Sequence, residues 1–221
     1  MADQVIVTSR IKRALFAVLD AVPTYPYHVH GTVPVRKLDA IVDKFRARYP
    51  DLSRDRYYAC RQRKIGQPSH KLIVFRPEGD RDIQGFFVLL SSSPDASGER
   101  WQDARERKSR IVVYGYELVR HTRVGSDAPA WTWRIEAGHF RHLHQQMQDA
   151  IDKRKDDWLK SWLHSTTKWP GFAGVRQQHA ALKKAFYGRW RRVRRSSEIA
   201  PDFPRLPYVT RRHARNMGGA A

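Results

Sequence analysis

The sequence predicts an α+β protein that ends in an arginine-rich pair of helices. Amphipathic helical patterns open and close the chain, and the region between them alternates apolar and polar residues between loops rich in Gly and Pro. Runs of strands flanked by helices are typical of α+β folds, here with an antiparallel sheet. The 221 residues include seven Trp, nine Tyr and nine Phe, and 41% are hydrophobic, so the chain has enough apolar surface for a packed core.

The first part of the chain is predicted to run helix, strand, helix. Apolar residues repeat at helical spacing over residues 8–22, and Pro23 and Pro26 end this pattern. Residues 27–33 alternate with the period of two that is typical of a strand. Residues 34–49 return to a helical pattern.

The middle of the chain is predicted to form strands separated by the polar loops IGQPSH, RPEGDRD, SSSPDASGE and VGSDAP. Cys60 is the only cysteine and is expected to be a small buried hydrophobe in the first of these strands, so neither an internal disulfide nor a Cys-based zinc site is expected. Trp131 and Trp133 share one face of the last strand, where aromatic residues are usually core but can also stack bases. Strands are expected at residues 56–65, 71–76, 85–91, 110–120 and 130–136, and a short charged helix at residues 99–109.

Two helices are predicted to follow, at residues 136–164 and 171–195, joined by the linker STTKWPGFAG. The second has an apolar stripe that should dock it against the rest of the protein: Val175, Leu182, Phe186, Trp190 and Val193. The chain is thus expected to divide into an α+β core (residues 1–136), a helical arginine-rich region (137–195) and an extended basic tail (196–221).

Positive charge is concentrated in the last fifth of the chain. The formal net charge is +20, and the segment from Arg176 to Arg215 holds twelve Lys and Arg against two acids. Concentrated like charge destabilises a compact fold, so a polyanionic partner is expected, and the phosphate backbone of a nucleic acid is the commonest one. The residues expected to bind it are Arg176, Lys183, Lys184, Arg189, Arg191, Arg192, Arg194, Arg195, Arg211 and Arg212.

His28-Val29-His30 is the sharpest local motif, because its two histidines point to the same side of a strand. The segment resembles the paired metal ligands of HUH endonucleases, the rolling-circle replication and transposase enzymes, whose nucleophile would correspond to Tyr187. Metal-free RNA cleavage is the alternative, with Tyr27, His28 and His30 as catalytic candidates. There a histidine deprotonates the 2′-hydroxyl while arginines stabilise the charged phosphate.

The chain also resembles the CRISPR RNA-processing endoribonucleases of the RAMP superfamily, above all their plasmid-borne type IV branch. The resemblance rests on the strand-helix-strand-strand order of residues 27–75, the antiparallel strands after it and the arginine-rich helix of residues 176–195. GFAG (residues 171–174) is the segment that could stand in for the Gly-rich loop of many RAMP proteins. The resemblance implies a ferredoxin-like or RRM-like core, metal-independent cleavage 3′ of a repeat hairpin, and retention on the guide RNA within a larger ribonucleoprotein.

Together these observations predict a structured-RNA-binding protein that processes guide RNA as a metal-independent endoribonuclease. The alternatives are a DNA-binding or DNA-nicking protein of a mobile element with HUH chemistry, and a non-catalytic nucleic-acid-binding subunit. An RNA hairpin is the expected partner, with DNA as the second choice. No cofactor and no metal are expected, because the acids are sparse and scattered. Without an apolar run of membrane-spanning or signal-peptide type, a cytoplasmic location and no membrane partner are expected.

Overall fold

The main sheet of the protein has five strands and is mixed. A computed structural model describes residues 4–79, 82–95, 98–122 and 127–208. The strands of this sheet are β1 (Val5–Thr8), β2 (Tyr27–Pro34), β3 (His70–Phe75), β4 (Gln84–Ser91) and β5 (Gln102–Asp103), in the spatial order β1-β3-β4-β2-β5. β1 pairs with β3 in parallel, and the other pairs are antiparallel. The α+β class is confirmed, but the sheet is not wholly antiparallel as predicted.

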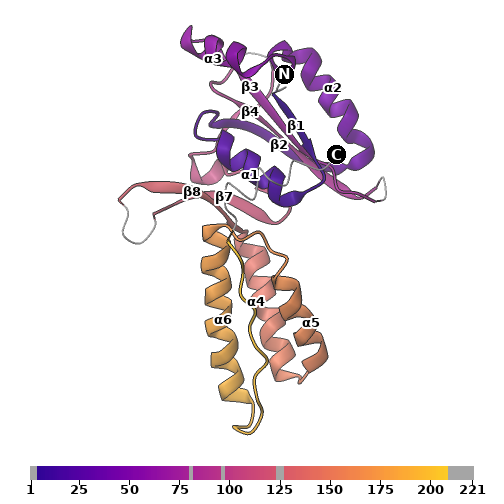
Figure 1. Cartoon of the computed structure of the whole chain (residues 1–221), viewed down its shortest axis with the longest axis vertical. Helices are drawn as coiled ribbons and strands as arrows, with labels where there is room; N and C mark the ends of the chain where they lie inside the picture. Colours follow the sequence, from indigo (N-terminus) through magenta and orange to yellow (C-terminus); the bar gives the residue numbers. More distant parts are fainter. Residues whose placement is uncertain (1–3, 80–81, 96–97, 123–126, 209–221) are drawn as a thin grey trace.

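Helices α1 (Ile11–Ala21) and α2 (Leu38–Arg48) cover opposite faces of this sheet (Figure 1). Leu15 of α1 belongs to a core cluster with Ile73 of β3, whereas Phe45 of α2 belongs to another cluster with Leu72 of β3. Successive residues of a strand point to opposite faces, so a strand covered on both sides must be apolar throughout. The uninterrupted LIVF run at the end of β3 meets this requirement.

A second, three-stranded antiparallel sheet closes the core on the α1 side. Its strands are β6 (Val112–Val113), β7 (Tyr116–Thr122) and β8 (Pro129–Ile135), in the order β6-β7-β8. Leu118 and Trp133 of this sheet join the same core cluster as Leu15, and the Trp133 Nε1–H donates to the Leu15 carbonyl oxygen at 2.7 Å. Helix α1 therefore packs between the two sheets.

Three helices form a second core beyond the sheets: α4 (Ala137–Asp152), α5 (Asp156–Thr166) and α6 (Ala173–Val193). Figure 1 shows these helices extending away from the two sheets along the long axis of the molecule. The Glu136 carboxylate caps α4 by accepting the backbone N–H groups of Gly138 and His139. Phe203 of the tail packs into the same helical core. Among the described residues, no helix is both long and apolar enough to cross a membrane.

Residues 56–65 form a helix, so the predicted strand is wrong. Helix α3 (Arg56–Lys64) begins at Asp55, whose Oδ1 accepts the Tyr58 N–H at 2.9 Å and caps the helix. Of its nine residues, only Ala59 is buried, so the helix lacks the apolar stripe by which a helical pattern is recognised. Cys60 is a free, half-buried cysteine on this helix and not the buried strand residue that was predicted.

The helical predictions differ from the structure at two further places. Residues 136–164 form two helices instead of one, because the chain turns at Arg154, which has a left-handed φ of 53°. Residues 99–109 contain β5 and the 3-10 turn Arg107–Ser109 in place of the predicted helix. The arginine-rich helix itself is confirmed as α6, within two residues of its predicted ends.

The strand predictions failed at one turn and at one edge. The predicted strand at residues 110–120 is divided into β6 and β7 by Tyr114 and Gly115, which both have positive φ. β1, with the β-branched sequence VIVT, was not predicted. The resulting order β1-α1-β2-α2-α3-β3-β4 has helices between its second and third strands, whereas a β-α-β-β-α-β ferredoxin-like unit joins those strands directly.

Candidate nucleic-acid interface

Helix α6 has two faces of different chemistry. One buries Val175, Leu182, Phe186 and Trp190 and confirms the predicted stripe except at Val193, which is 36% exposed. None of the cations on the other face forms an ion pair within the part of the chain that the structure describes. These exposed cations, which we call the cationic face of α6, are Lys183, Lys184, Arg191, Arg192 and, just beyond the helix end, Arg195.

Two of the arginines predicted to bind nucleic acid are instead engaged by carboxylates. The side chain of Arg194 is 1% exposed, lies over the Trp190 ring and forms ion pairs with Asp156 and Glu198. Arg189 Nε donates to Asp152 Oδ1 at 2.8 Å, and this bond lowers the pKa of the Asp152 carboxyl. Both guanidinium charges are thus already compensated, so the geometry favours a structural role for these two residues.

The remaining three predicted binding residues lie elsewhere. Arg176, on the first turns of α6, is half-buried, and its guanidinium carbon is 3.5 Å from the centroid of the Tyr208 ring. Arg211 and Arg212 lie outside the described residues.

Helix α3 carries a second cationic surface that sequence reasoning missed. Tyr57 is 84% exposed among its arginines, and exposed aromatic rings beside cations are typical of surfaces that bind single-stranded nucleic acid. Figure 1 places α3 at the end of the long axis opposite to α4, α5 and α6. The exposed cations in and next to α3 are Arg54, Arg56, Arg61 and Lys64. The cap residue Asp55 before the run and the cations at its end were the sequence signals of a helix here.

His28 and His30 form one closed chain of hydrogen bonds. His28 Nε2 is 2.7 Å from the carbonyl oxygen of Ser109, so this nitrogen must carry the proton. The Val112 N–H donates to His30 Nε2 at 3.3 Å, so the proton of His30 must lie on Nδ1. His30 Nδ1 then donates to His28 Nδ1 at 3.1 Å. Each neutral ring has one donor and one acceptor, and all four nitrogen atoms are used.

This pairing suits a structural connection better than catalysis. His28 is fully buried, and burial lowers its pKa from 6.5 to about 4. Burial also lowers the pKa of His30. A general base or a metal ligand needs a free lone pair, and both lone pairs already accept hydrogen bonds. The pair instead connects β2 by hydrogen bonds to Ser109 and to Val112 at the start of the second sheet.

Tyr27 does not join the histidine pair. Neighbouring residues of a strand point to opposite faces, so Tyr27 lies across β2 from His28. Its hydroxyl oxygen accepts a hydrogen bond from Arg105 Nη2 at 3.2 Å. Arg105 also pairs with Asp103 at 2.7 Å, and this contact lowers the pKa of the Asp103 carboxyl. The predicted catalytic set is therefore divided between two faces of the strand.

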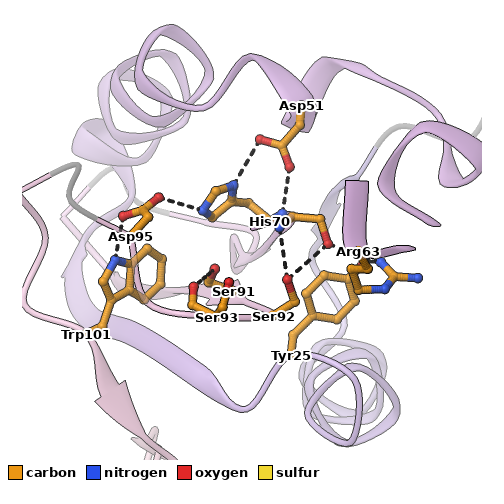
Figure 2. Close-up of polar contacts among 10 residues, drawn as sticks. Tyr25, Asp51, Arg63, His70, Ser91, Ser92, Ser93, Asp95 and Trp101 are labelled. Carbon is orange, nitrogen blue, oxygen red and sulfur yellow. Dashed lines mark hydrogen bonds and ion pairs between the residues drawn. The ribbon is translucent and has the colours of Figure 1, made fainter. Parts of the chain in front are cut away.

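A buried imidazole lies between two carboxylates at the start of β3 (Figure 2). His70 Nδ1 is 2.9 Å from Asp51 Oδ1, and His70 Nε2 is 3.0 Å from Asp95 Oδ2. The His70 backbone N–H also donates to Asp51 Oδ2 at 2.6 Å, and Trp101 Nε1 donates to Asp95 Oδ1 at 2.8 Å. The ring can donate a hydrogen bond to each carboxylate only when both of its nitrogen atoms carry a proton.

The His70 side chain is almost completely shielded from solvent. The ring is 4% exposed and packs against Tyr49, with ring centroids 4.2 Å apart. The nearby Ser91 hydroxyl donates to the Ser93 carbonyl oxygen at 2.6 Å and not to His70. A ring with both nitrogen atoms engaged and no nucleophile beside it is suited to fastening the loops around β3, not to acid–base chemistry.

Tyr187, the nucleophile of the HUH interpretation, belongs to the helical core. Its hydroxyl oxygen accepts the Phe203 backbone N–H at 3.1 Å, and its ring packs edge-on against Phe186. It therefore packs against a different core cluster from Val33 of β2, the strand that carries the histidine pair. Among the described residues, no group of three or more His, Cys, Asp or Glu could hold a metal ion.

Comparison with known proteins assigns no family to the chain. A scan against family models finds none that matches the chain, and searches of curated proteins and of solved structures find no match either.

Proposed function

We propose that the protein binds nucleic acid through the cationic face of α6, and that structured RNA is its ligand. The observation that carries this proposal is the absence of carboxylate partners for all five cations of this face among the described residues, while Arg189 and Arg194 of the same helix are paired. Unpaired cations on an ordered helix repel one another unless a polyanion neutralises them.

The dimensions of the face fit a phosphate backbone. From Lys183 to Arg195 the helix rises by roughly 18 Å, at about 1.5 Å per residue. A duplex carries about ten phosphate charges over such a length, counted on both strands. Gly188, in the middle of the face, has nothing within 4 Å of the position where a Cβ would lie, so a ligand backbone can approach the helix closely there.

The preference for RNA is the finer part of the proposal. Arginine outnumbers lysine on the face, which favours bidentate phosphate contacts and stacking on unpaired bases. An arginine-bearing helix is also a common means of holding a folded RNA hairpin. Cleavage is not part of the proposal, because every nitrogen of the histidine pair is engaged. The proposed role is therefore that of a binding subunit, which fits retention on an RNA within a larger assembly.

The experiment compares one hairpin sequence made as RNA and as DNA, with single-stranded DNA as a third ligand. Affinity is measured by fluorescence anisotropy over a series of salt concentrations, and product formation is followed on gels with and without EDTA. The variant replaces Arg191, Arg192 and Arg195 with Gln. The control replaces Lys37, Arg100 and Arg107 with Gln. These are exposed cations elsewhere on the surface, so the control removes the same net charge.

We expect the RNA hairpin to bind more tightly than either DNA and to remain uncleaved. The α6 variant should lower the slope of log K against log salt by roughly 2 to 3, because each lost phosphate contact removes about 0.7 to 0.9. The control variant should change the slope far less. An unchanged slope in the α6 variant would show that the cationic face of α6 does not contact the phosphate backbone. Tighter binding of the DNA hairpin or of single-stranded DNA than of the RNA hairpin would show that DNA, and not RNA, is the ligand.

A further inference from the structure

A groove of about 780 Å³ opens between α1, β8, the start of α6 and the tail. Its volume lies within the roughly 300 to 1,000 Å³ that small-ligand sites occupy. Aromatic rings make up much of its wall, and none of the described residues that line it is an acid. The rings are those of Phe16, Trp131, Phe172 and Tyr208, which come from four separate segments of the chain.

Two arginines lie against these rings. The Arg176 guanidinium covers the Tyr208 ring at 3.5 Å from its centroid, and Arg176 Nε has no hydrogen-bond partner among the described residues. The Arg120 guanidinium is 5.8 Å from the centroid of the Trp131 ring. A cation over a ring can be shared with a second planar group that enters beside it. The Arg176 charge, unlike that of Arg194, is therefore free to meet an anionic ligand.

Trp131 and Trp133 differ in their surroundings although both lie on one face of β8. Trp133 is fully buried, and its Nε1–H donates to a backbone carbonyl of α1. Trp131 is only half-buried and borders the groove. Tryptophans on a sheet face either pack in the core or stack on bases. Trp133 packs in the core, whereas the indole ring of Trp131 is placed where it can stack on a base.

The ends of two elements add polar groups to the groove. α6 begins there with its Gly174 N–H donating to the Thr132 hydroxyl at 3.1 Å and with no acid in its first turn, so no carboxylate of that turn offsets the positive end of its dipole. β8 is the outer strand of its sheet, and Ala130 and Thr132 line the groove. The Ile135 backbone bonds to Gln178 on the outer side of β8, so by the alternation of an antiparallel ladder the backbone groups of Trp131 also point to this outer edge, where they can bond to the edges of a base.

We propose that this groove binds unpaired nucleotides, with bases stacked on Trp131 and Tyr208 and a phosphate contacted by Arg176. The inference rests on the proposed function, because it assigns to the groove the unpaired nucleotides that continue from a hairpin held farther along the same helix. A peptide strand added to the edge of β8 is the competing occupant. The rings, the cations and the absence of acids among the described lining residues favour the nucleotide.

The test uses a blunt RNA hairpin, the same hairpin with a four-nucleotide unpaired extension at either end, and hexauridylate. Each is titrated against the wild-type protein, Tyr208→Ala, Arg176→Gln and the control Arg100→Gln. Tyr208 is 70% exposed, so its replacement should leave the fold intact, which thermal melting verifies. In a second readout, 4-thiouridine in the extension is crosslinked by light and the attached peptide is mapped by mass spectrometry.

We expect an extension to tighten binding by about tenfold or more, because a stacked base typically contributes between about 5-fold and 150-fold in affinity. Tyr208→Ala and Arg176→Gln should remove this gain and leave the affinity for the blunt hairpin unchanged, and the crosslinks should map to β8 or the tail. Equal affinity for extended and blunt hairpins in the wild type, or a gain that survives in both variants, overturns the inference. If the blunt hairpin fails to bind while hexauridylate binds in a Tyr208-dependent manner, the groove stands and the hairpin proposal falls.

Discussion

Replacing Arg194 with Gln should destabilise the protein and leave its binding of nucleic acid unchanged. By composition Arg194 is one more cation of the basic segment, alongside Arg191, Arg192 and Arg195. The structure separates it from them, because its side chain is 1% exposed and pairs with Asp156 and Glu198. The two ion pairs join the C-terminal end of α6 to the start of α5 and to the tail.

The size of the effect follows from the exposure of the partners. Breaking a fully buried pair costs about 3 to 5 kcal/mol, because the remaining charge is left without compensation. The Asp156 and Glu198 side chains are 45% and 26% exposed and regain water once Arg194 is removed. A loss of about 2 to 3 kcal/mol is therefore expected for Arg194→Gln. For a chain of this length that lowers Tm by roughly 4 to 12 °C.

The assay pairs thermal melting with binding at several salt concentrations. Arg194→Gln should lower Tm and leave the salt slope unchanged, whereas the triple Gln variant of Arg191, Arg192 and Arg195 should lower the slope and leave stability within about 0.5 kcal/mol per substitution. A double-mutant cycle with Asp156→Asn then isolates the coupling of the ion pair. An unchanged Tm in Arg194→Gln, or a slope that falls as much as in an exposed-arginine variant, would refute the assignment of Arg194 to the fold.

Three further predictions concern stability. Burial lowers the pKa of His28 to about 4, so between about pH 6.5 and pH 4 only the unfolded chain gains a proton there, and the free energy of unfolding should fall by about 3 kcal/mol as the pH falls through that window. Denaturant titrations at neutral and acid pH check this, and an equally steep pH dependence in His28→Gln would contradict it. Gly174→Ala should lower the free energy of unfolding by about 1 to 3 kcal/mol in melting experiments, because its Cβ would lie 2.6 Å from the Trp133 carbonyl oxygen. Gly188→Ala should raise the free energy of unfolding by up to about 1 kcal/mol, because nothing lies within 4 Å of its Cβ position. Equal effects of the two substitutions would refute the packing argument. Asp51→Ala should lower stability by about 1 to 3 kcal/mol, because His70 loses the acceptor of its backbone N–H, and a Tm equal to that of the wild type would argue against the cluster.

The predictions from sequence succeeded where a segment shows a regular apolar pattern and failed where it does not. α1, α2 and α6 each show an apolar stripe at helical spacing, β2 alternates with a period of two, and β3 and β4 each show an apolar run of strand length, so their types follow from local pattern alone. α3 buries only Ala59, so it lacks an apolar stripe at helical spacing, and its adjacent tyrosines and Cys60 were mistaken for part of a strand. The turn at Arg154 depends on a left-handed backbone conformation at a residue type that gives no signal of it.

The candidate nucleic-acid interface was likewise predicted only as far as local sequence pattern allows. The basic segment and its docked helix were evident from charge and periodicity, which are local properties of the chain. The engagement of each arginine was not evident, because Asp152 and Asp156 lie on other helices and reach α6 only in the folded protein. The same holds for His28, whose bond to Ser109 spans 81 residues of sequence.

The sequence by itself therefore determined that this is an α+β protein with a strongly cationic, docked helix, because composition and periodicity set the charge and the apolar face of each segment. Only the tertiary structure decided which cations are free, that the histidine pair is engaged, and that Trp131 borders a groove while Trp133 fills the core. The physical reason is that exposure, hydrogen-bond partners and charge compensation arise between segments distant in the chain, which come together only when the core forms.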